Sequence, residues 1–139
     1  MNDKNPLDGL VERWRTVGYD ALTDTEKLWL NIRTFIDSTQ NGGLISYFFN
    51  PGANTFADCI ASLEALGASE VLRHVSRLAA CFGETVPVTV EARNDVIDSW
   101  PEQGVEEQLV EELDDILMPL MSDLDGLLAR YLREHGIAT

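Results

Sequence analysis

The segment from residue 104 to residue 135 limits the fold more than any other part of the chain. Its apolar residues recur every three or four positions, the spacing of one face of an α-helix. At 100° per residue, the first of them fall within an arc of about 80°: Val105, Leu109, Leu113, Ile116 and Leu120. Leu124, Leu127 and Tyr131 continue the stripe, whereas Pro119 should kink or interrupt the helix because proline has no N–H to donate. The segment therefore predicts a long amphipathic helix packed on a core.

Shorter helical segments, separated by glycine and proline, account for the rest of the chain. We expect them at residues 5–18, 23–41, 44–49, 54–67, 69–83 and 89–99. The segment 86–90 alternates briefly like a β-strand, but it contains a proline and has no partner strand, so we interpret it as a loop. The prediction is an all-α fold: one compact domain over residues 1–139, with about six to eight helices and no substantial sheet.

Several residues are typical of helix ends. We expect side-chain caps at the starts of three helices: Thr23 with Glu26, Asn54 or Thr55, and Ser69. Gly42 and Gly43 should end the helix that begins near Thr23, because glycine adopts left-handed dihedral angles without strain. These signals divide the chain at the same places as the apolar spacing.

The charge is strongly negative and unevenly distributed. The chain has 24 acidic and 10 basic residues, a net charge of −14, and an isoelectric point near 4.3. Residues 1–83 carry a net charge of −3, whereas residues 84–139 carry −11. Phosphate groups would be repelled by most of this surface, which argues against direct binding to nucleic acid or to an anionic membrane. The uneven distribution predicts one domain with an acidic C-terminal portion, residues 84–139, and indicates that one part of its surface faces a charged partner.

Carboxylates crowd the predicted C-terminal helix. Between residues 102 and 115, seven of 14 residues are acidic and none is basic. The main candidates for binding a partner are Glu106, Glu107, Glu111, Glu112, Asp114 and Asp115, and a second set is Glu91, Asp95, Asp98, Glu102, Asp123 and Asp125. Like charges three or four residues apart destabilise a helix, here by on the order of 1–2 kcal/mol in total. Such a row is either a recognition surface or a solvated face that only maintains solubility.

We expect the row to bind a basic protein, because a rigid helix with unpaired carboxylates can occupy the surface that a DNA-binding protein presents to phosphates. By displacing DNA, such a protein would regulate a DNA-binding regulator. An alternative from another class is an immunity or antitoxin-like protein that caps a basic toxin, because it needs the same kind of surface.

Signals for chemistry are weak. Cys59, Cys81, His74 and His135 have no spacing typical of a metal site, and both cysteines lie on apolar stripes, which favours buried structural thiols. We therefore expect no metal, no cofactor and no catalytic residues, and we do not expect an enzyme. The N-terminal residues contain no apolar segment typical of a signal peptide, and no segment is apolar enough to span a membrane. A cytoplasmic location is the expectation.

Residues 40–52, QNGGLISYFFNPG, form a motif at the end of one predicted helix and along the next. With weaker matches near Thr23, at residues 65–68 and at residues 131–135, this motif resembles a bacterial all-helical family, the DNA mimic proteins of the "DMP nineteen" type, over about residues 20–135. Leu44 departs from the expected aromatic residue and Gln40 from the expected asparagine.

The resemblance implies a dimeric DNA mimic that binds a helix-turn-helix transcription factor and blocks its binding to the operator. The motif residues themselves are Gln40, Asn41, Gly42, Gly43, Tyr47, Phe48, Phe49 and Asn50. We expect them to be structural, with Asn41 and the glycines ending a helix and the aromatic residues filling the core. The alternative is a polar pocket lined by Gln40, Asn41, Tyr47 and Asn50, which a small-molecule enzyme would require.

Overall fold

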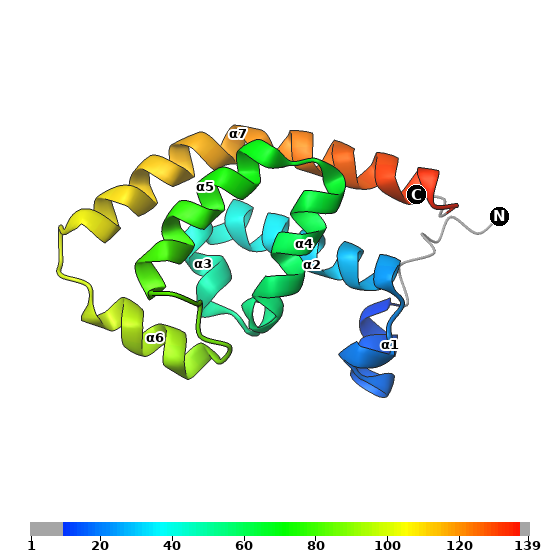
Figure 1. Ribbon diagram of the computed structural model, residues 1–139, viewed down its shortest axis with the longest axis horizontal. Helices are drawn as coiled ribbons and strands as arrows, with labels where there is room; N and C mark the ends of the chain where they lie inside the picture. Colours follow the sequence, from blue (N-terminus) through cyan, green and yellow to red (C-terminus); the bar gives the residue numbers. More distant parts are fainter. Residues whose placement is uncertain (1–9, 137–139) are drawn as a thin grey trace.

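The computed structural model describes residues 10–136 and is all-α (Figure 1). Its helices are α1 (Leu10–Val17), α2 (Asp24–Gly42), α3 (Leu44–Phe49), α4 (Phe56–Leu66), α5 (Ser69–Ala79), α6 (Val90–Ser99) and α7 (Val105–Glu134). Short 3-10 turns lie at Tyr19–Ala21, Pro51–Thr55 and Ala80–Phe82. No strand occurs among these residues, so the prediction of an all-α fold is confirmed. The predicted start of the first helix, near residue 5, lies outside the described residues.

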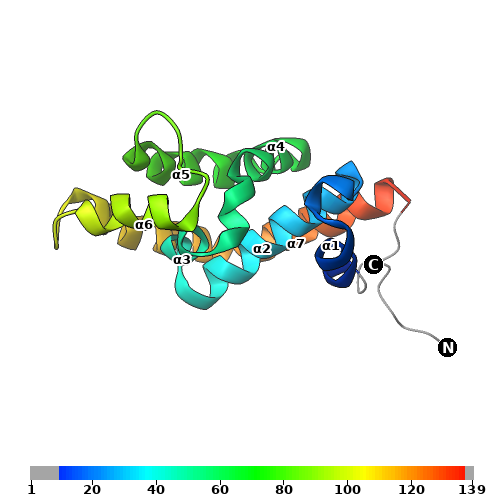
Figure 2. The ribbon, with the colours of Figure 1, turned by 90° about the horizontal axis from the view of Figure 1, so that it is seen from below.

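The two long helices, α2 and α7, pack against each other and against the α4–α5 hairpin. Figure 2 shows α4 and α5 as one layer beside the layer that contains α2 and α7. Helix α3 fills the space next to α2, and α6 packs on α3. At one end of the molecule, α6 and the first turns of α7 converge on the connection between them (Figure 1). The acidic C-terminal portion is therefore no separate domain: α6 and the start of α7 form one end of the molecule, and the rest of α7 packs along the other helices.

The core is aliphatic along the long helices and aromatic around α3. Side chains with no exposed surface include Ile32 and Phe35 of α2 and Tyr47 and Phe48 of α3. The rings of Phe35 and Tyr47 meet edge-on, with centroids 5.3 Å apart. Phe49, by contrast, is 43% exposed, so the prediction that all three aromatic residues of the motif fill the core is wrong for this one. Phe49 comes directly after Phe48 in α3, so its side chain points about 100° away from that of Phe48 around the helix.

Helix α7 is rotated relative to its predicted orientation. Its buried residues are Leu113, Leu117, Met121, Leu124, Leu128 and Leu132, and the centre of this stripe lies about 90° around the helix from the predicted one. Most of the predicted stripe is half-buried, and Val105 is 75% exposed. The helix is apolar over a wide arc, and contact with α2 on one side and α5 on the other decides which part of the arc is central.

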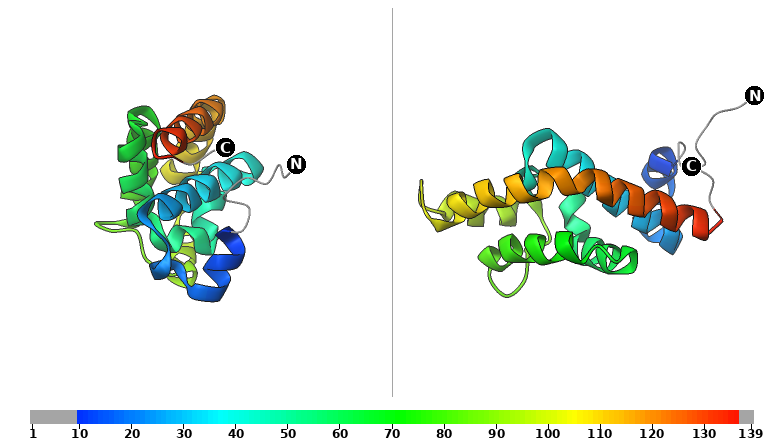
Figure 3. Two further views of the ribbon diagram at one scale, coloured as in Figure 1. Left: turned by 90° about the vertical axis from the view of Figure 1, so that its right-hand side faces the viewer. Right: turned by 90° about the horizontal axis from the view of Figure 1, so that it is seen from above.

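Pro119 does not interrupt α7, which is continuous from Val105 to Glu134. Figure 3 shows the helix as one gently curved rod along the molecule. Pro119 is exposed, so the carbonyl that loses its helical partner, that of Asp115, lies on the solvent side, where long helices bow outward. Of the two predicted effects, interruption is therefore wrong and the bend is mild.

The predicted helix caps differ in outcome. Thr23 and Glu26 form the expected capping box at the start of α2. Thr55 precedes α4, but its hydroxyl donates to Oδ1 of Asn31 at 2.6 Å instead of capping the helix. Ser69 is the first helical residue of α5 and not its cap, because the helix begins from Ala68, which follows a left-handed glycine. These two predictions are therefore wrong in detail.

Candidate functional site

The carboxylate of Asp114 belongs to the fold and not to an acidic surface. Its Oδ1 accepts a hydrogen bond from the backbone N–H of Leu44, the first residue of α3, at 2.8 Å. The carboxylate lies so close to Gly43 that an added Cβ there would be 2.6 Å from Oδ2. Gly43 also has φ of 82° and ψ of 174°, a conformation that side chains disfavour. The second glycine of the motif is thus needed to join α2 to α3 under this carboxylate.

Three further predicted carboxylates contact the body of the protein. Glu112 forms an ion pair with Arg77 of α5, with N and O 2.5 Å apart. Asp125 forms one with Arg33 of α2 at 3.0 Å. Glu106 is only half-exposed, and its Oε1 is buried without a hydrogen-bond partner among the described residues. The prediction of one continuous acidic face on α7 is therefore wrong, because the rotation of the helix turns part of it inward.

The outer carboxylates of α7 are Glu107, Glu111 and Asp115, which we call the α7 ridge. They are spaced four residues apart, are all exposed, and form no ion pair with any described residue. At 1.5 Å per residue, one carboxylate occurs about every 6 Å along the helix. Glu107 also accepts a hydrogen bond from the backbone N–H of Gln103 at 2.7 Å, which holds the turn before α7.

A second row lies on α6 and consists of Glu91, Asp95 and Asp98, which we call the α6 row. Their spacing places them within an arc of about 60° on one face of the helix, and all three are exposed. Glu102, in the turn that leads to α7, is exposed as well. The structure thus keeps eight of the predicted residues, counting Asp123, as exposed carboxylates without an ion pair among residues 10–136.

The opposite face of α6 carries Arg93, the one cation between residues 84 and 129. Its side chain is completely buried. It donates to the carbonyl oxygens of Phe48, Pro87, Val88 and Asn50 and to Oδ1 of Asn54, at 2.8–3.0 Å. Burial lowers the pKa of this guanidinium from its ordinary value. Arg93 therefore neutralises no surface carboxylate. Residues 84–129 contain no other cation that could neutralise the exposed carboxylates of α6 and α7.

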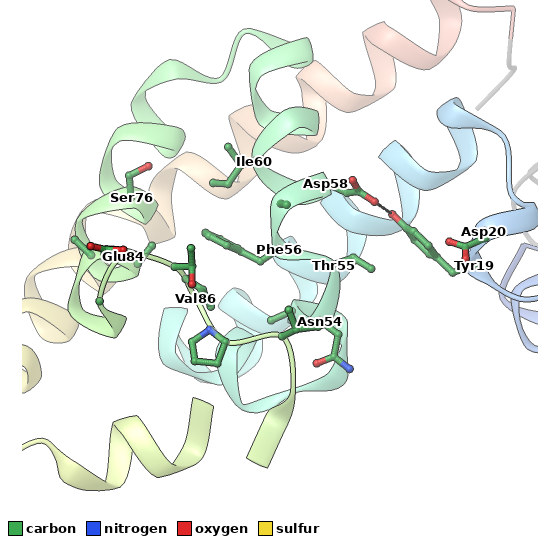
Figure 4. A pocket seen from close by; sticks show the side chains of 18 residues that line it. Tyr19, Asp20, Asn54, Thr55, Phe56, Asp58, Ile60, Ser76, Glu84 and Val86 are labelled. Carbon is green, nitrogen blue, oxygen red and sulfur yellow. Dashed lines mark hydrogen bonds between the residues drawn. The ribbon is translucent and has the colours of Figure 1, made fainter. Parts of the chain in front are cut away.

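A cavity of about 790 Å³ opens between α4, the end of α5 and residues 83–88 (Figure 4). At one edge the Tyr19 hydroxyl donates to Oδ2 of Asp58 at 2.6 Å and accepts from the amide of Asn31 at 2.8 Å. Burial, together with the Asp58 carboxylate, raises the pKa of Tyr19 to about 12. The phenol therefore remains a proton donor at neutral pH and fixes the orientation of the carboxylate.

The motif residues do not line this cavity, and they do not line a smaller one of 210 Å³ beside Asp123. Gln40 and Asn41 are exposed, and Asn50 donates from its side chain to the carbonyl of Ser46 at 2.7 Å. The alternative of a polar pocket formed by the motif is therefore not supported. The motif lies at the helix junction that Arg93 and Asp114 hold together.

The DMP19-like protein family matches residues 20–135 of the chain. The chain belongs to this family. The resemblance noted in the sequence is thereby confirmed, and the matched region contains both acidic rows, the buried arginine and the motif. A search of curated proteins finds no match to the chain, and a search of solved structures finds none either.

Two features were missed in the sequence. Arg93 gave no signal, because its acceptors are mostly backbone carbonyls and one amide from distant parts of the chain. The cavity was missed because it is assembled from four separate segments.

Of the cysteines, Cys59 is buried as expected, whereas Cys81 is only half-buried. Within residues 10–136, no three metal-binding side chains converge, and no helix has the length and hydropathy to cross a bilayer.

Proposed function

We propose that this protein binds a basic DNA-binding protein through the α7 ridge and the α6 row and thereby prevents that protein from binding DNA. The observation that carries the proposal is that none of these carboxylates forms an ion pair with any residue that the structure describes. The one cation in residues 84–129 is buried, and the arginines that reach α7 from α2 and α5 pair with other carboxylates. Membership of the DMP19-like family supports the same function.

The arrangement suits a competitor of DNA. Fixed carboxylates on a rigid helix present negative charge without the flexibility of an acidic tail, so less conformational entropy is lost on binding. Lysine and arginine side chains placed to meet phosphates would meet these carboxylates instead. The exposed carboxylates form two rows, one on α6 and one on α7, in place of the single acidic face that the sequence predicted.

The test begins with capture of the partner from a lysate of the source organism at low and at high salt. The captured DNA-binding protein is then mixed with its labelled DNA site, and release of the DNA is followed as this protein is added. We expect release that weakens as salt rises, because exposed charges are screened. The combined variant Glu107→Gln, Glu111→Gln and Asp115→Asn should weaken release about tenfold, at 0.2–1 kcal/mol per exposed charge.

The matched control removes three exposed carboxylates elsewhere: Glu12→Gln, Glu64→Gln and Glu134→Gln. It has the same net charge as the ridge variant and should release DNA within about twofold of the native protein. Equal losses in both variants would mean that only the net charge matters and would overturn the proposal. Capture of a toxin and of no DNA-binding protein would overturn it in favour of the immunity alternative.

A further inference from the structure

The cavity between α4, α5 and residues 83–88, here called the groove, has no role in the proposed function. Its volume of about 790 Å³ lies within the range of sites that bind specific ligands. It is open to solvent along one side, between segments that are far apart in the sequence (Figure 4). A groove of this size accommodates more than one side chain of a bound partner.

The floor of the groove is apolar. Phe56 and Ile60 of α4 and Val86 of the loop line it, and all three are half-buried. Figure 4 shows the Phe56 ring in the middle of the groove, beside Val86. Burying this surface would contribute roughly in proportion to the apolar area removed from water. The floor therefore favours a large aliphatic or aromatic side chain as the occupant of the centre.

The two ends of the groove are acidic. In Figure 4, Glu84 lies at one end, and Asp58 and Asp20 lie at the other, with Phe56 between them. All three carboxylates are exposed, and no lysine, arginine or histidine is among the described residues that line the groove. An anionic or acidic occupant would be repelled at both ends. The charge complementarity therefore selects an occupant with a cation on each side of an apolar centre.

The walls of the groove are held in place before any partner arrives. Arg93 bonds the carbonyls of Pro87 and Val88 on one wall and the amide of Asn54 on the other. At the far end, the hydroxyl of Tyr19 fixes Asp58. A preformed site loses less entropy on binding than a flexible one does. The buried arginine therefore shapes the groove in addition to stabilising the junction of α3 and α6.

We propose that the groove binds a short segment of a partner protein in which one large apolar side chain is flanked on both sides by lysine or arginine. A single small amine would satisfy only one end and leave the apolar floor uncovered. The inference deepens the proposed function and rests on it, because it assigns to the basic partner a second contact, away from the α7 ridge.

A random peptide library selected on the full-length protein tests this inference. We expect enriched peptides that contain a large apolar residue with basic residues on either side, and chemical-shift changes confined to residues 19–20, 53–60 and 76–88 in the NMR spectrum. Glu84→Gln and Asp58→Asn should each weaken such a peptide about two- to fivefold. Asparagine can still accept the Tyr19 proton, so the second variant should keep its fold.

Glu64→Gln is the matched control, because Glu64 is an exposed carboxylate of α4 outside the groove. It should change peptide affinity by less than twofold. Equal loss in this control, no enrichment of basic residues, or shift changes on α6 and α7 would overturn the inference. Full displacement of the peptide by an equal concentration of spermidine would also overturn it, because the groove would then recognise only a small cation.

The outcomes separate the two proposals. Glu111→Gln with Asp115→Asn should leave peptide binding unchanged, because neither residue lines the groove. Normal peptide binding together with no release of DNA from any partner would overturn the proposed function and leave the groove as a peptide site. Normal release of DNA without any peptide binding to the groove would overturn the present inference alone.

Discussion

Charged side chains on the inner sides of α6 and α7, which face α3, are bonded within the fold, whereas those on the outer sides are exposed to solvent. On the inner side, Arg93 and Asp114 have their hydrogen-bonding groups occupied by the backbone of α3 and its neighbours. On the outer side, the α6 row and the α7 ridge have no cation beside them among the described residues. Charge that stabilises the fold and charge available to a partner thus alternate along the same two helices, sometimes between adjacent residues.

The largest effect should come from the inner side of α6. Arg93→Met removes five hydrogen bonds and leaves buried carbonyls without donors, so the free energy of unfolding should fall by about 3–5 kcal/mol. Urea denaturation followed by circular dichroism measures the change. Arg93→Lys keeps the charge but not the planar fork of donors, and it should recover part of the loss. A loss under about 1 kcal/mol for the methionine variant would show that the inner side is not structural.

The next effect concerns the glycine under Asp114. Gly43→Ala adds a Cβ 2.6 Å from the carboxylate, on a backbone with φ of 82°, and should cost about 2–3 kcal/mol in the same assay. Combining it with Asp114→Ala removes the clash but not the backbone strain. The two changes together should therefore cost less than the sum of the single changes, whereas strict additivity would contradict the contact.

Asp114→Ala alone should be smaller in effect. It removes one hydrogen bond and one negative charge at the start of α3, which is worth about 1–2 kcal/mol. Asp115→Ala removes the same group from the adjacent outer position and serves as the control, with no loss of stability expected. Equal losses of stability in the Asp114→Ala and Asp115→Ala variants would contradict the distinction between inner and outer carboxylates.

The smallest effect has the opposite sign. Neutralising Glu111 and Asp115 removes the like-charge pairs of the ridge, so stability should rise by about 0.5–1 kcal/mol at low ionic strength. The gain should shrink in high salt, where the charges are screened. A loss of stability would mean that these carboxylates have partners within the fold.

The sequence predicted what is local and missed what depends on helix rotation. The Thr23–Glu26 cap lies within one turn, so its residue types were sufficient to identify it. The sequence could not separate Asp114 from Asp115, because the difference depends on which part of α7 faces α3. Likewise, the partners of Arg93 include carbonyls more than 40 residues away, and carbonyls are the same in every residue type.

The most direct test compares two double variants of α7 in the DNA-release assay. Glu111→Gln with Asp115→Asn changes the outer side, and Glu112→Gln with Asp114→Asn changes the inner side at neighbouring positions. Both remove two charges, and both are measured where circular dichroism shows the protein folded. We expect the outer variant to release DNA about fivefold less effectively and the inner one to differ by less than twofold. Equal losses, or a greater loss for the inner variant, would contradict the division of charge between fold and partner.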